Sequence, residues 1–402
     1  MTEFFFEKLL DFGSEWSVER IDFNENNEVD IYLKWNLEEY KKANKLSYEF
    51  VHDYRDYRRW RHLDILQFKT YIVAQIPRVK SKDGKIESVK VPWASDGNRH
   101  TFLFETWIID WLLATKNQTK TAQMLRCGFN LVNRVIHMAS KRGIERRNEN
   151  TVYQQLSLDE KAFQKGHSYV TVLSDPLSGV IIEVVKDRTK NACKELLNKS
   201  LTEFQKSKVE TISLDMWKAF NTTVDEILPK AKKVHDRFHL IKYLNEAIDL
   251  VRKREVKTNP ALINSRYSLL KNTENLTQKQ HFKFDEVLRL NTKVGYVWGL
   301  KESFKSLFGC KNYQEALNRF SEWNSFVVWE AIPELCKVAK MFSNHMSGVC
   351  NALVEKISNA MAERLNGKIQ ILKTIGRGYR KFENFRSAIL FFNGGLKLYP
   401  HN

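Results

Sequence analysis

Two aspartates occupy equivalent places after short apolar segments. Asp159 follows the run QLSL and Asp215 follows the run TISL, so the dipeptide Ser-Leu precedes both acids. If the two runs are neighbouring strands, the carboxylates lie a few ångströms apart, and a divalent cation relieves their repulsion. Glu363, on a predicted late helix, is placed to supply a third acid. Three such acids can hold two Mg²⁺ or Mn²⁺ ions about 4 Å apart, the arrangement that activates an oxygen nucleophile for phosphoryl transfer.

A structural explanation is also open for each acid, because aspartate is frequent in turns and at helix caps. One aspartate after one strand would therefore indicate little. Two aspartates after strands, followed by a glutamate on a late helix, are less easily accidental. The spacing alone leaves the catalytic and the structural interpretations open.

The segments around the two aspartates predict a mixed α/β domain. A turn at 175–179 (DPLSG) joins two of its strands, and Thr189 is suited to cap a helix. The predicted order is three strands, helix, strand, helix, strand, helix, which is the order of an RNase H-like fold with a mixed five-stranded sheet. In that fold the first and fourth strands are parallel neighbours, so Asp159 and Asp215 lie side by side. The predicted strands are 152–158, 168–174, 180–185, 209–214 and 231–235, and the predicted helices are 189–204, 218–228 and 238–254.

The remaining segments predict further parts. Residues 1–95 read mainly as strands, at 29–35, 68–76 and 86–91 with a turn at 82–85. Residues 101–147 change to helical spacing, and helices at 119–126 and 130–141 around Cys127-Gly128-Phe129 have the loose outline of a helix-turn-helix. Residues 257–350 read helical throughout, and a final helix at 353–371 carries Glu363.

The net charge of +17 over 402 residues indicates a polyanionic partner. Residues 1–50 hold 12 acidic and 6 basic residues, whereas 51–150 hold 19 basic and 10 acidic ones, and 241–402 hold 26 basic and 14 acidic ones. The run YRDYRRWRH (54–62) interleaves aromatic rings with arginines, which suits contact with phosphates. A solvated edge strand with its rings in the core is an equally open interpretation of that run.

Cysteine usage and hydropathy bear on the compartment. The five cysteines are scattered without a C-x-x-C pair, which fits reduced thiols in a cytosolic protein and gives no metal-ligand framework. The sequence has no run of eighteen apolar residues, and its start lacks a basic stretch followed by an apolar core. We expect a cytoplasmic protein with no membrane partner.

From about Asp56 onward the sequence resembles the ISL-three family of bacterial insertion-sequence transposases. The resemblance rests on the order and spacing of seven segments: RRWRHLD (58–64), VPWA (91–94), SLDEKAFQKGHSYVTVLSD (157–175), SLDMWKAF (213–220), DRFHLIKYLNEAID (236–249), SNAMAERLNGKI (358–369) and GYRKFENFR (378–386).

The resemblance implies roles for particular residues. The family's acids that match Asp159, Asp215 and Glu363 form a DDE triad, which binds Mg²⁺ or Mn²⁺ as two ions. Asp236 and His239 match an Asp-x-x-His motif with a supporting role, although a capped helix start with a packed imidazole would look the same. The implied domains are a β-rich domain (1–95), a helix-turn-helix (96–150), an RNase H-like catalytic domain (151–256 and 351–402) and an all-helical insertion (257–350).

The implied activity is that of a DNA-cutting and DNA-joining enzyme. Such an enzyme binds the terminal inverted repeats of its element on double-stranded DNA, acts as a homodimer or higher oligomer, and associates with the bacterial nucleoid. Two alternatives stay open: a transposase-derived DNA-binding regulator that does not cut, and a structure-selective nuclease. The residues expected to contact DNA are Arg55, Arg58, Arg59, Arg61, Asn130, Asn133, Arg134, Lys141, Arg142, Arg146, Arg147, Arg364, Lys368, Arg377, Arg380 and Lys381.

The sequence departs from the family pattern in two places. Family members usually carry cysteine pairs of zinc-ribbon type on either side of RRWRHLD, but residues 41–50 and 78–93 contain no cysteine. We therefore expect a degenerate ribbon-like domain that folds without zinc. The motif Asn-Gly-x-x-Glu-Gly-x-Asn reads NAMAERLN at 359–366, which keeps the glutamate and both asparagines.

Overall fold

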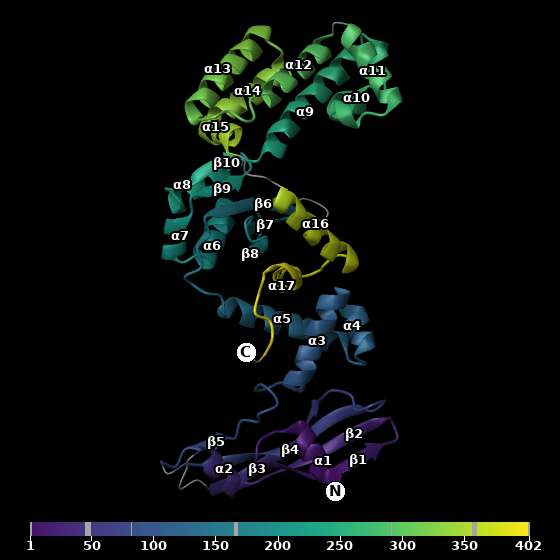
Figure 1. Cartoon of the computed structure of the whole chain (residues 1–402), viewed down its shortest axis with the longest axis vertical. Helices are drawn as coiled ribbons and strands as arrows, with labels where there is room; N and C mark the ends of the chain where they lie inside the picture. The colour runs from purple at the N-terminus through teal and green to yellow at the C-terminus, as the bar shows by residue number, and fades with distance from the viewer. Residues whose placement is uncertain are drawn as a thin grey trace. The chain divides into compact units, whose positions relative to one another are not determined.

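The computed structural model describes residues 2–44, 50–81, 83–164, 168–290, 292–355 and 360–400 (Figure 1). The chain forms two compact units. The first comprises Met1–Arg147 with the short segments Ile375–Arg377 and Leu396–Asn402. The second comprises Asn148–Thr374 and Gly378–Gly395. No helix in the described ranges is both long and apolar enough to cross a membrane.

A five-stranded mixed sheet opens the first unit. Its strand order is β1-β2-β4-β3, with β5 paired to β4; β2 and β4 are parallel and the other pairs antiparallel. Apolar residues alternate along β2, and Ile31 with Ile72 of β4 lies in a core that includes Trp60 and Trp93. The elements are α1 (Thr2–Leu10), β1 (Trp16–Asn24), β2 (Glu28–Trp35), α2 (Leu37–Asn44), β3 (Phe50–Arg61), β4 (Lys69–Lys80) and β5 (Ile86–Ser88).

The predicted strands at 29–35 and 68–76 are confirmed as β2 and β4. The predicted strand at 86–91 is shorter than expected, because only β5 pairs with β4 there. In the predicted turn at 82–85, Gly84 has φ 79°, which favours glycine, while Lys82 lies outside the described residues.

Three helices complete the first unit: α3 (Phe102–Thr115), α4 (Gln118–Met124) and α5 (Phe129–Glu145). Thr101 and Asn117 cap the first two with their side chains. Between α4 and α5, Arg126 adopts a left-handed φ of 49°, which ends α4 and lets the chain turn before Gly128. The two predicted helices on either side of Cys127-Gly128-Phe129 are therefore present, and α5 extends beyond 141.

The second unit contains another five-stranded sheet, in the order β10-β9-β6-β7-β8. The pairs β6–β7 and β7–β8 are antiparallel, whereas β6–β9 and β9–β10 are parallel. Ile212 of β9 and Leu156 of β6 lie in its buried core with Phe220 of α8. The elements are β6 (Gln155–Gln164), β7 (Ser168–Asp175), β8 (Val180–Lys186), α6 (Lys190–Ser200), α7 (Glu203–Lys208), β9 (Thr211–Leu214), α8 (Lys218–Ile227), β10 (Lys232–His235) and α9 (Arg237–Glu255).

The observed elements differ from prediction in two instructive places. The predicted helix 189–204 is divided into α6 and α7, because Thr202 and Gln205 form a reciprocal capping box that starts a new helix. The first strand also continues past Asp159 to Gln164, because β6 keeps pairing with β7 after its pairing with β9 has ended. Asp159 therefore lies where the parallel pairing stops, within β6, and does not close the strand as expected.

The part of the chain between β10 and Glu363 forms a group of helices around an aromatic core of its own. Phe304, Phe320 and Phe342 are fully buried there, and α9 packs against this group as well as following the sheet. The predicted helical character of 257–350 is confirmed. The helices are α10 (Arg266–Leu270), α11 (Gln278–Arg289), α12 (Lys293–Lys305), α13 (Tyr313–Glu330), α14 (Pro333–Asn344) and α15 (Met346–Val354), with 3₁₀ turns at Pro260–Leu262 and Thr273–Asn275.

The chain then returns to the sheet through α16 (Ala360–Ile375) and α17 (Phe382–Asn393), which Figure 1 shows in yellow-green and yellow. Phe163 of β6 stacks on Phe385 of α17 at 5.3 Å, and Arg386 forms an ion pair with Glu183 of β8. The predicted helix 353–371 is divided differently. Its first two residues belong to the end of α15, residues 356–359 lie outside the described residues, and α16 begins at Ala360.

Candidate active site

Asp159 and Asp215 lie at adjacent positions on neighbouring parallel strands. Leu158 and Leu214 are paired across β6 and β9, and each aspartate is the next residue along. Neighbouring strands are about 5 Å apart, so the two carboxylates share one small region. Each carboxylate accepts a hydrogen bond from the following backbone N–H, at 2.7 Å from Glu160 and 2.6 Å from Met216. The local backbone thus holds both carboxylates at the same end of the parallel pair.

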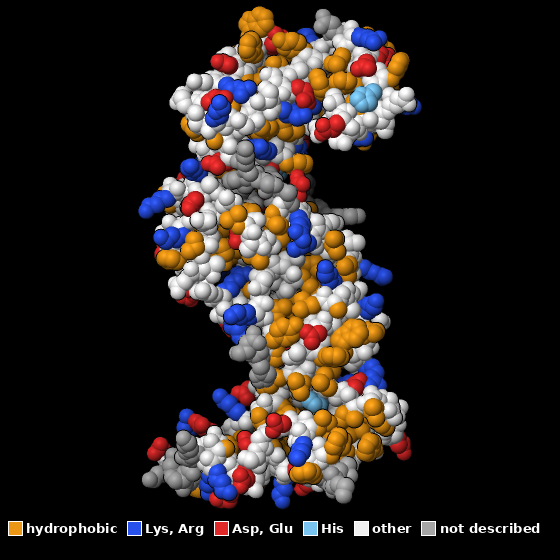
Figure 2. All heavy atoms as spheres, in the orientation of Figure 1, with side chains coloured by type: hydrophobic (Ala, Val, Ile, Leu, Met, Phe, Trp, Pro, Cys, Tyr) orange, Lys and Arg blue, Asp and Glu red, His pale blue; other side chains and the backbone are white. Residues whose placement is uncertain are grey.

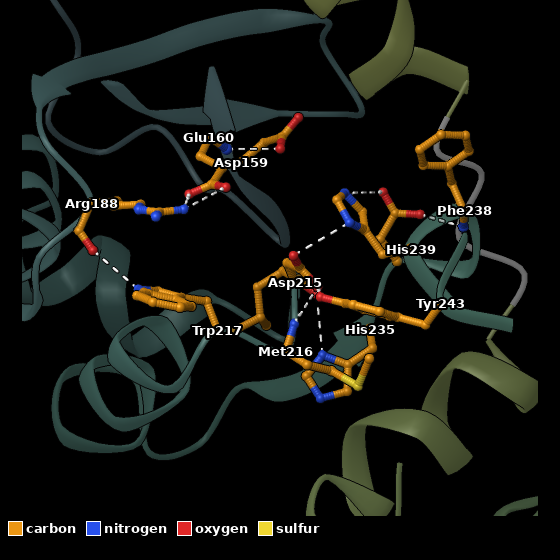
Figure 3. A network of polar contacts seen from close by, with 12 residues as sticks. Asp159, Glu160, Arg188, Asp215, Met216, Trp217, His235, Phe238, His239 and Tyr243 are labelled. Carbon is orange, nitrogen blue, oxygen red and sulfur yellow. Dashed lines mark hydrogen bonds and ion pairs between the residues drawn. The ribbon is translucent and has the colours of Figure 1, made fainter. Parts of the chain in front are cut away.

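The start of α9 brings further polar groups to Asp215 (Figure 3). Asp236 caps the helix and accepts a hydrogen bond from the N–H of Phe238 at 2.6 Å. The Nδ1 atom of His239 lies 3.3 Å from Asp215 Oδ2, and its Nε2 atom lies 3.9 Å from Asp236 Oδ2. Tyr243, one turn later on the same face, donates its hydroxyl to Asp215 Oδ1 at 3.4 Å.

Electrostatics at these groups indicate crowded negative charge. Burial raises the pKa of Asp236, and the nearby charge of Asp159 acts in the same direction. Burial and the charge of Asp215 raise the pKa of Tyr243 to about 12, so its hydroxyl stays protonated as a donor. His239 Nδ1 is buried and makes no well-directed hydrogen bond despite its distance from Asp215. The buried Nδ1 atom of His239 is therefore close to Asp215 without being aligned with it in a hydrogen bond.

Helix α16 reaches Asp159 through Asn366 in this structure. Asn366 donates from Nδ2 to Asp159 Oδ2 at 2.6 Å, and Lys373 donates to the carbonyl of Ala162 at 2.8 Å, so α16 follows β6. Glu363 lies one turn before Asn366 and is exposed. Within the described ranges, no three Asp, Glu, His or Cys side chains are grouped closely enough to hold a metal ion. The structure therefore brings Asp159, Asp215, Asp236 and His239 together but leaves Glu363 outside their group.

The donor set nevertheless fits a hard divalent cation. Two carboxylates at adjacent positions offer the oxygen ligands that Mg²⁺ and Mn²⁺ prefer. Lys161 Nζ lies 3.5 Å from Asp159 Oδ2 and partly balances its charge in this structure.

A second group of side chains lies on the opposite side of the aspartates from His239 (Figure 3). Arg188 donates to both carboxylate oxygens of Glu160 at 3.2 Å, and its guanidinium lies over the ring of Trp217 at 4.8 Å. Sequence reasoning missed Arg188, Trp217 and Tyr243, and it noted Asn366 as a retained motif residue without giving it a role. Tyr243 could have been found, because it is four residues after His239 on one helix face, whereas nothing in the sequence marks Arg188.

The residues predicted to contact DNA have unequal surroundings. Arg61 is buried, donates to the carbonyls of His62 and Thr70, and pairs with Asp64, which disfavours the predicted phosphate contact. Several others also have protein partners: Arg59 pairs with Glu28 and Asp30, Arg142 with Glu105 and the Leu398 carbonyl, and Arg146 with the Tyr399 carbonyl. Half-buried positions are Arg58, Asn133, Arg147 and Lys368. Exposed positions are Arg55, Asn130, Arg134, Lys141, Arg364, Arg377, Arg380 and Lys381.

Comparison with known proteins identifies the class to which this fold and site belong. The family model described as "Transposase", that of the ISL-three DDE transposases, matches residues 156–389. The chain belongs to this family of transposases, and the matched region includes Asp159, Asp215 and Glu363.

Two relatives cover most of the chain at modest identity. The transposase for insertion sequence element IS1557 of Mycobacterium tuberculosis is 25% identical over 351 residues, covering 80% of this chain and 78% of its own length. The transposase for insertion sequence element IS1001 of Bordetella parapertussis is 25% identical over 339 residues, covering 82% of each. The likeness therefore extends well beyond the acids themselves.

Proposed function

We propose that this transposase binds the terminal inverted repeats of its insertion sequence and catalyses metal-dependent DNA cleavage and strand transfer. In this proposal Asp159, Asp215 and Glu363 hold two Mg²⁺ or Mn²⁺ ions. The observation that carries it is the adjacency of Asp159 and Asp215 on β6 and β9. The strand order of the second sheet, three antiparallel strands followed by two parallel ones, supports the RNase H-like assignment.

Glu363 would join the aspartates through a small adjustment of α16. Side chains three residues apart on a helix have Cβ atoms about 5–6 Å apart, so Glu363 is one helical step from Asn366, which already contacts Asp159. We propose that DNA or metal binding moves α16 by about that step.

The bound ions would supply activation of the attacking oxygen and stabilisation of the leaving oxygen. The protein's own groups would position the acids: the backbone N–H groups of Glu160 and Met216 orient the two carboxylates, and Tyr243 donates to Asp215. His239 lies between Asp215 and Asp236 and would fix their relative orientation.

For DNA recognition we propose that α4 and α5 act as a helix-turn-helix. The exposed side chains of Asn130 and Arg134, at the start of α5, would face base edges in the major groove. The alternative, a DNA-binding regulator that no longer cuts, would need the same surface but not the aspartate pair.

The test is cleavage of a labelled duplex that contains the element's own ends, with purified full-length protein in Mg²⁺. We expect Asp159→Ala, Asp215→Ala and Glu363→Ala each to abolish strand cleavage while DNA affinity stays within about threefold, because the basic surfaces are unchanged. Asp225→Ala is the matched control, since Asp225 is an exposed acid of α8 paired with Lys233 and should leave cleavage unchanged.

Near wild-type cutting by any triad variant would remove that residue from the triad. Specific binding of the ends without cleavage in Mg²⁺ or Mn²⁺ would favour the regulator.

A further inference from the structure

An aromatic and cationic surface borders the aspartate pair on the side away from His239 (Figure 3). Arg188 is its centre. The guanidinium donates to Glu160, lies 4.8 Å from the Trp217 ring centre, and lies 4.3 Å from the Tyr169 ring centre. Trp217 in turn donates from Nε1 to the carbonyl of Arg188 at 3.3 Å. Four segments are tied together in this way: β6, β7, the loop just after β8 and the N-cap of α8.

This cluster is attached to the aspartate pair by the chain itself. Glu160 directly follows Asp159, and Trp217 is two residues after Asp215 at the N-cap of α8. The cluster therefore keeps its place relative to both carboxylates.

The exposure of Trp217 is the unexplained feature. Its indole N–H is satisfied, yet the residue is 45% exposed, whereas Phe220 on the same helix is fully buried and supplies the core contact. Scattered exposed apolar residues are ordinary on protein surfaces. An exposed indole held by a cation–π contact and a hydrogen bond, beside a pair of acids, is more specific than that, because its ring is presented in one orientation.

We propose that Trp217 and Arg188 form a stacking subsite for one unpaired DNA base next to the phosphate that is cut. This inference rests on the proposed function and adds to it a contact with a single nucleotide. Every base presents a flat π-face, so an exposed indole can stack any of them without reading sequence. The planar guanidinium of Arg188, which has donors left after its pair with Glu160, suits the adjoining phosphate.

Stacking on a protein ring requires the base to leave the duplex. That separation is easiest for a base that is terminal, mismatched or already single-stranded, which is the state of DNA at a freshly cut end. The subsite would thus hold the end open beside Asp159 and Asp215 and keep the reacting phosphate in register with them.

The test is a double-mutant cycle between the protein and the DNA, measured as Kd with full-length protein and end-containing duplex, and as cleavage rate in Mg²⁺. Each nucleotide within about five positions of the cut is replaced in turn by an abasic site, and each duplex is measured with wild type and Trp217→Ala. Because a base stacked on an aromatic ring contributes strongly to binding, we expect Trp217→Ala to weaken binding about tenfold on normal DNA. At one position beside the cut, the abasic site should cause no further loss in Trp217→Ala.

Variants and outcomes separate the possibilities. Trp217→Phe, which keeps a ring, should retain the coupling, and Trp329→Ala, which removes an exposed indole of α13, should show none. The subsite would be overturned if the losses in DNA affinity from Trp217→Ala and from the abasic site were additive at every position, with the melting temperature of Trp217→Ala equal to that of wild type. Equal coupling in Trp329→Ala would also overturn it. If the wild-type protein cleaves DNA but the two losses in affinity add at every position, the subsite alone is rejected. If the affinities show coupling but the wild-type protein does not cleave, the proposed chemistry is rejected and the subsite stands.

Discussion

Single residues around the aspartate pair divide into groups that hold the carboxylates and groups that balance their charge. Backbone N–H groups, Asn366 and Tyr243 donate hydrogen bonds, while Lys161 contributes positive charge to Asp159. A carboxylate that accepts several hydrogen bonds keeps its orientation, which a metal ligand needs. The pair is therefore held in place by the protein before any cation binds.

Tyr243 allows a test of this positioning. We expect Tyr243→Phe to lower cleavage about tenfold at limiting Mg²⁺, because Asp215 loses a donor that orients it, and outer partners of metal ligands typically matter to that extent. The measurement is a Mg²⁺ titration of the cleavage rate alongside DNA affinity. Tyr296→Phe, at an exposed tyrosine of α12, is the matched control. An unchanged Mg²⁺ dependence in Tyr243→Phe would exclude the positioning role.

At this scale the sequence predicted that Asp159 and Asp215 lie side by side, but not the contacts around them. Asp159 and Asp215 come together because strand order is encoded locally, by hydrophobic runs and turns that can be read from the chain. The Asn366–Asp159 bond could not be predicted, because it depends on how a helix some two hundred positions later docks on β6. Arg61 shows the same limit, since its charge is visible in the sequence but its burial against Phe104 is not.

At the scale of elements, the join between the second sheet and the helical group depends on a close approach. Helix α15 packs against β10, where the ring of His235 is buried and donates from Nδ1 to the Leu214 carbonyl at 3.1 Å. A Cβ atom added at Gly348 would lie 2.5 Å from that ring. Only glycine lets the helix come this near to the strand.

Gly348→Ala should therefore destabilise the second unit by about 1–3 kcal/mol, the usual cost of overpacking a tight core position. Thermal or urea unfolding of the full chain measures it. Gly299→Ala on α12 is the control: a Cβ there meets nothing within 4 Å, so it should be neutral or stabilising by about 0.5–1 kcal/mol. Equal stability of Gly348→Ala and wild type would show that the His235 ring can move aside without lowering the free energy of unfolding.

The first sheet provides a second test at this scale. Its core of tryptophans and β-branched residues is buried without any cysteine in residues 1–100. All three histidines in that range have protein partners: His62 lies 2.9 Å from Thr101 Oγ1, His100 3.3 Å from Glu105 and His52 3.9 Å from Asp53. We predict a purified protein without stoichiometric zinc, whose melting is unchanged by a chelator. One equivalent of zinc by elemental analysis, lost together with folding of this unit, would contradict that.

For whole elements, periodicity predicted most helices and strands from residue 101 onward, where the departures arose mainly at element ends. In residues 1–95 it did not predict α1, β1 or α2, and it left β3 as one of two open interpretations. The helix break at Thr202 and the continuation of β6 past Asp159 depend on a side-chain cap and on a pairing partner. Hydrophobic patterns report which face is buried but not where a hydrogen-bonded element stops, so boundaries were the weaker part of the prediction.

At the scale of the whole molecule, we expect the excess of basic residues to govern the interaction with DNA. The net charge is +17, yet Lys and Arg side chains are scattered among acids over the face shown in Figure 2. Many arginines already serve internal ion pairs, as Arg59, Arg78 and Arg386 do. Total charge therefore overstates the number of cations free to meet phosphates, and individual residues must be tested.

Helix α5 carries exposed cations as well as a cation that is paired within the protein, so it supplies a matched test. DNA affinity should fall steeply with salt, with a slope of about −0.9 per phosphate contacted, since each contact releases a counterion. The double variant Arg134→Ala and Lys141→Ala should reduce that slope by about 1–2, because both residues are exposed. Arg142→Ala should leave the slope unchanged and lower the melting temperature, because Arg142 holds Glu105 and the Leu398 carbonyl. A salt-independent affinity, or a slope that changes only in Arg142→Ala, would show that the exposed cations of α5 do not meet DNA.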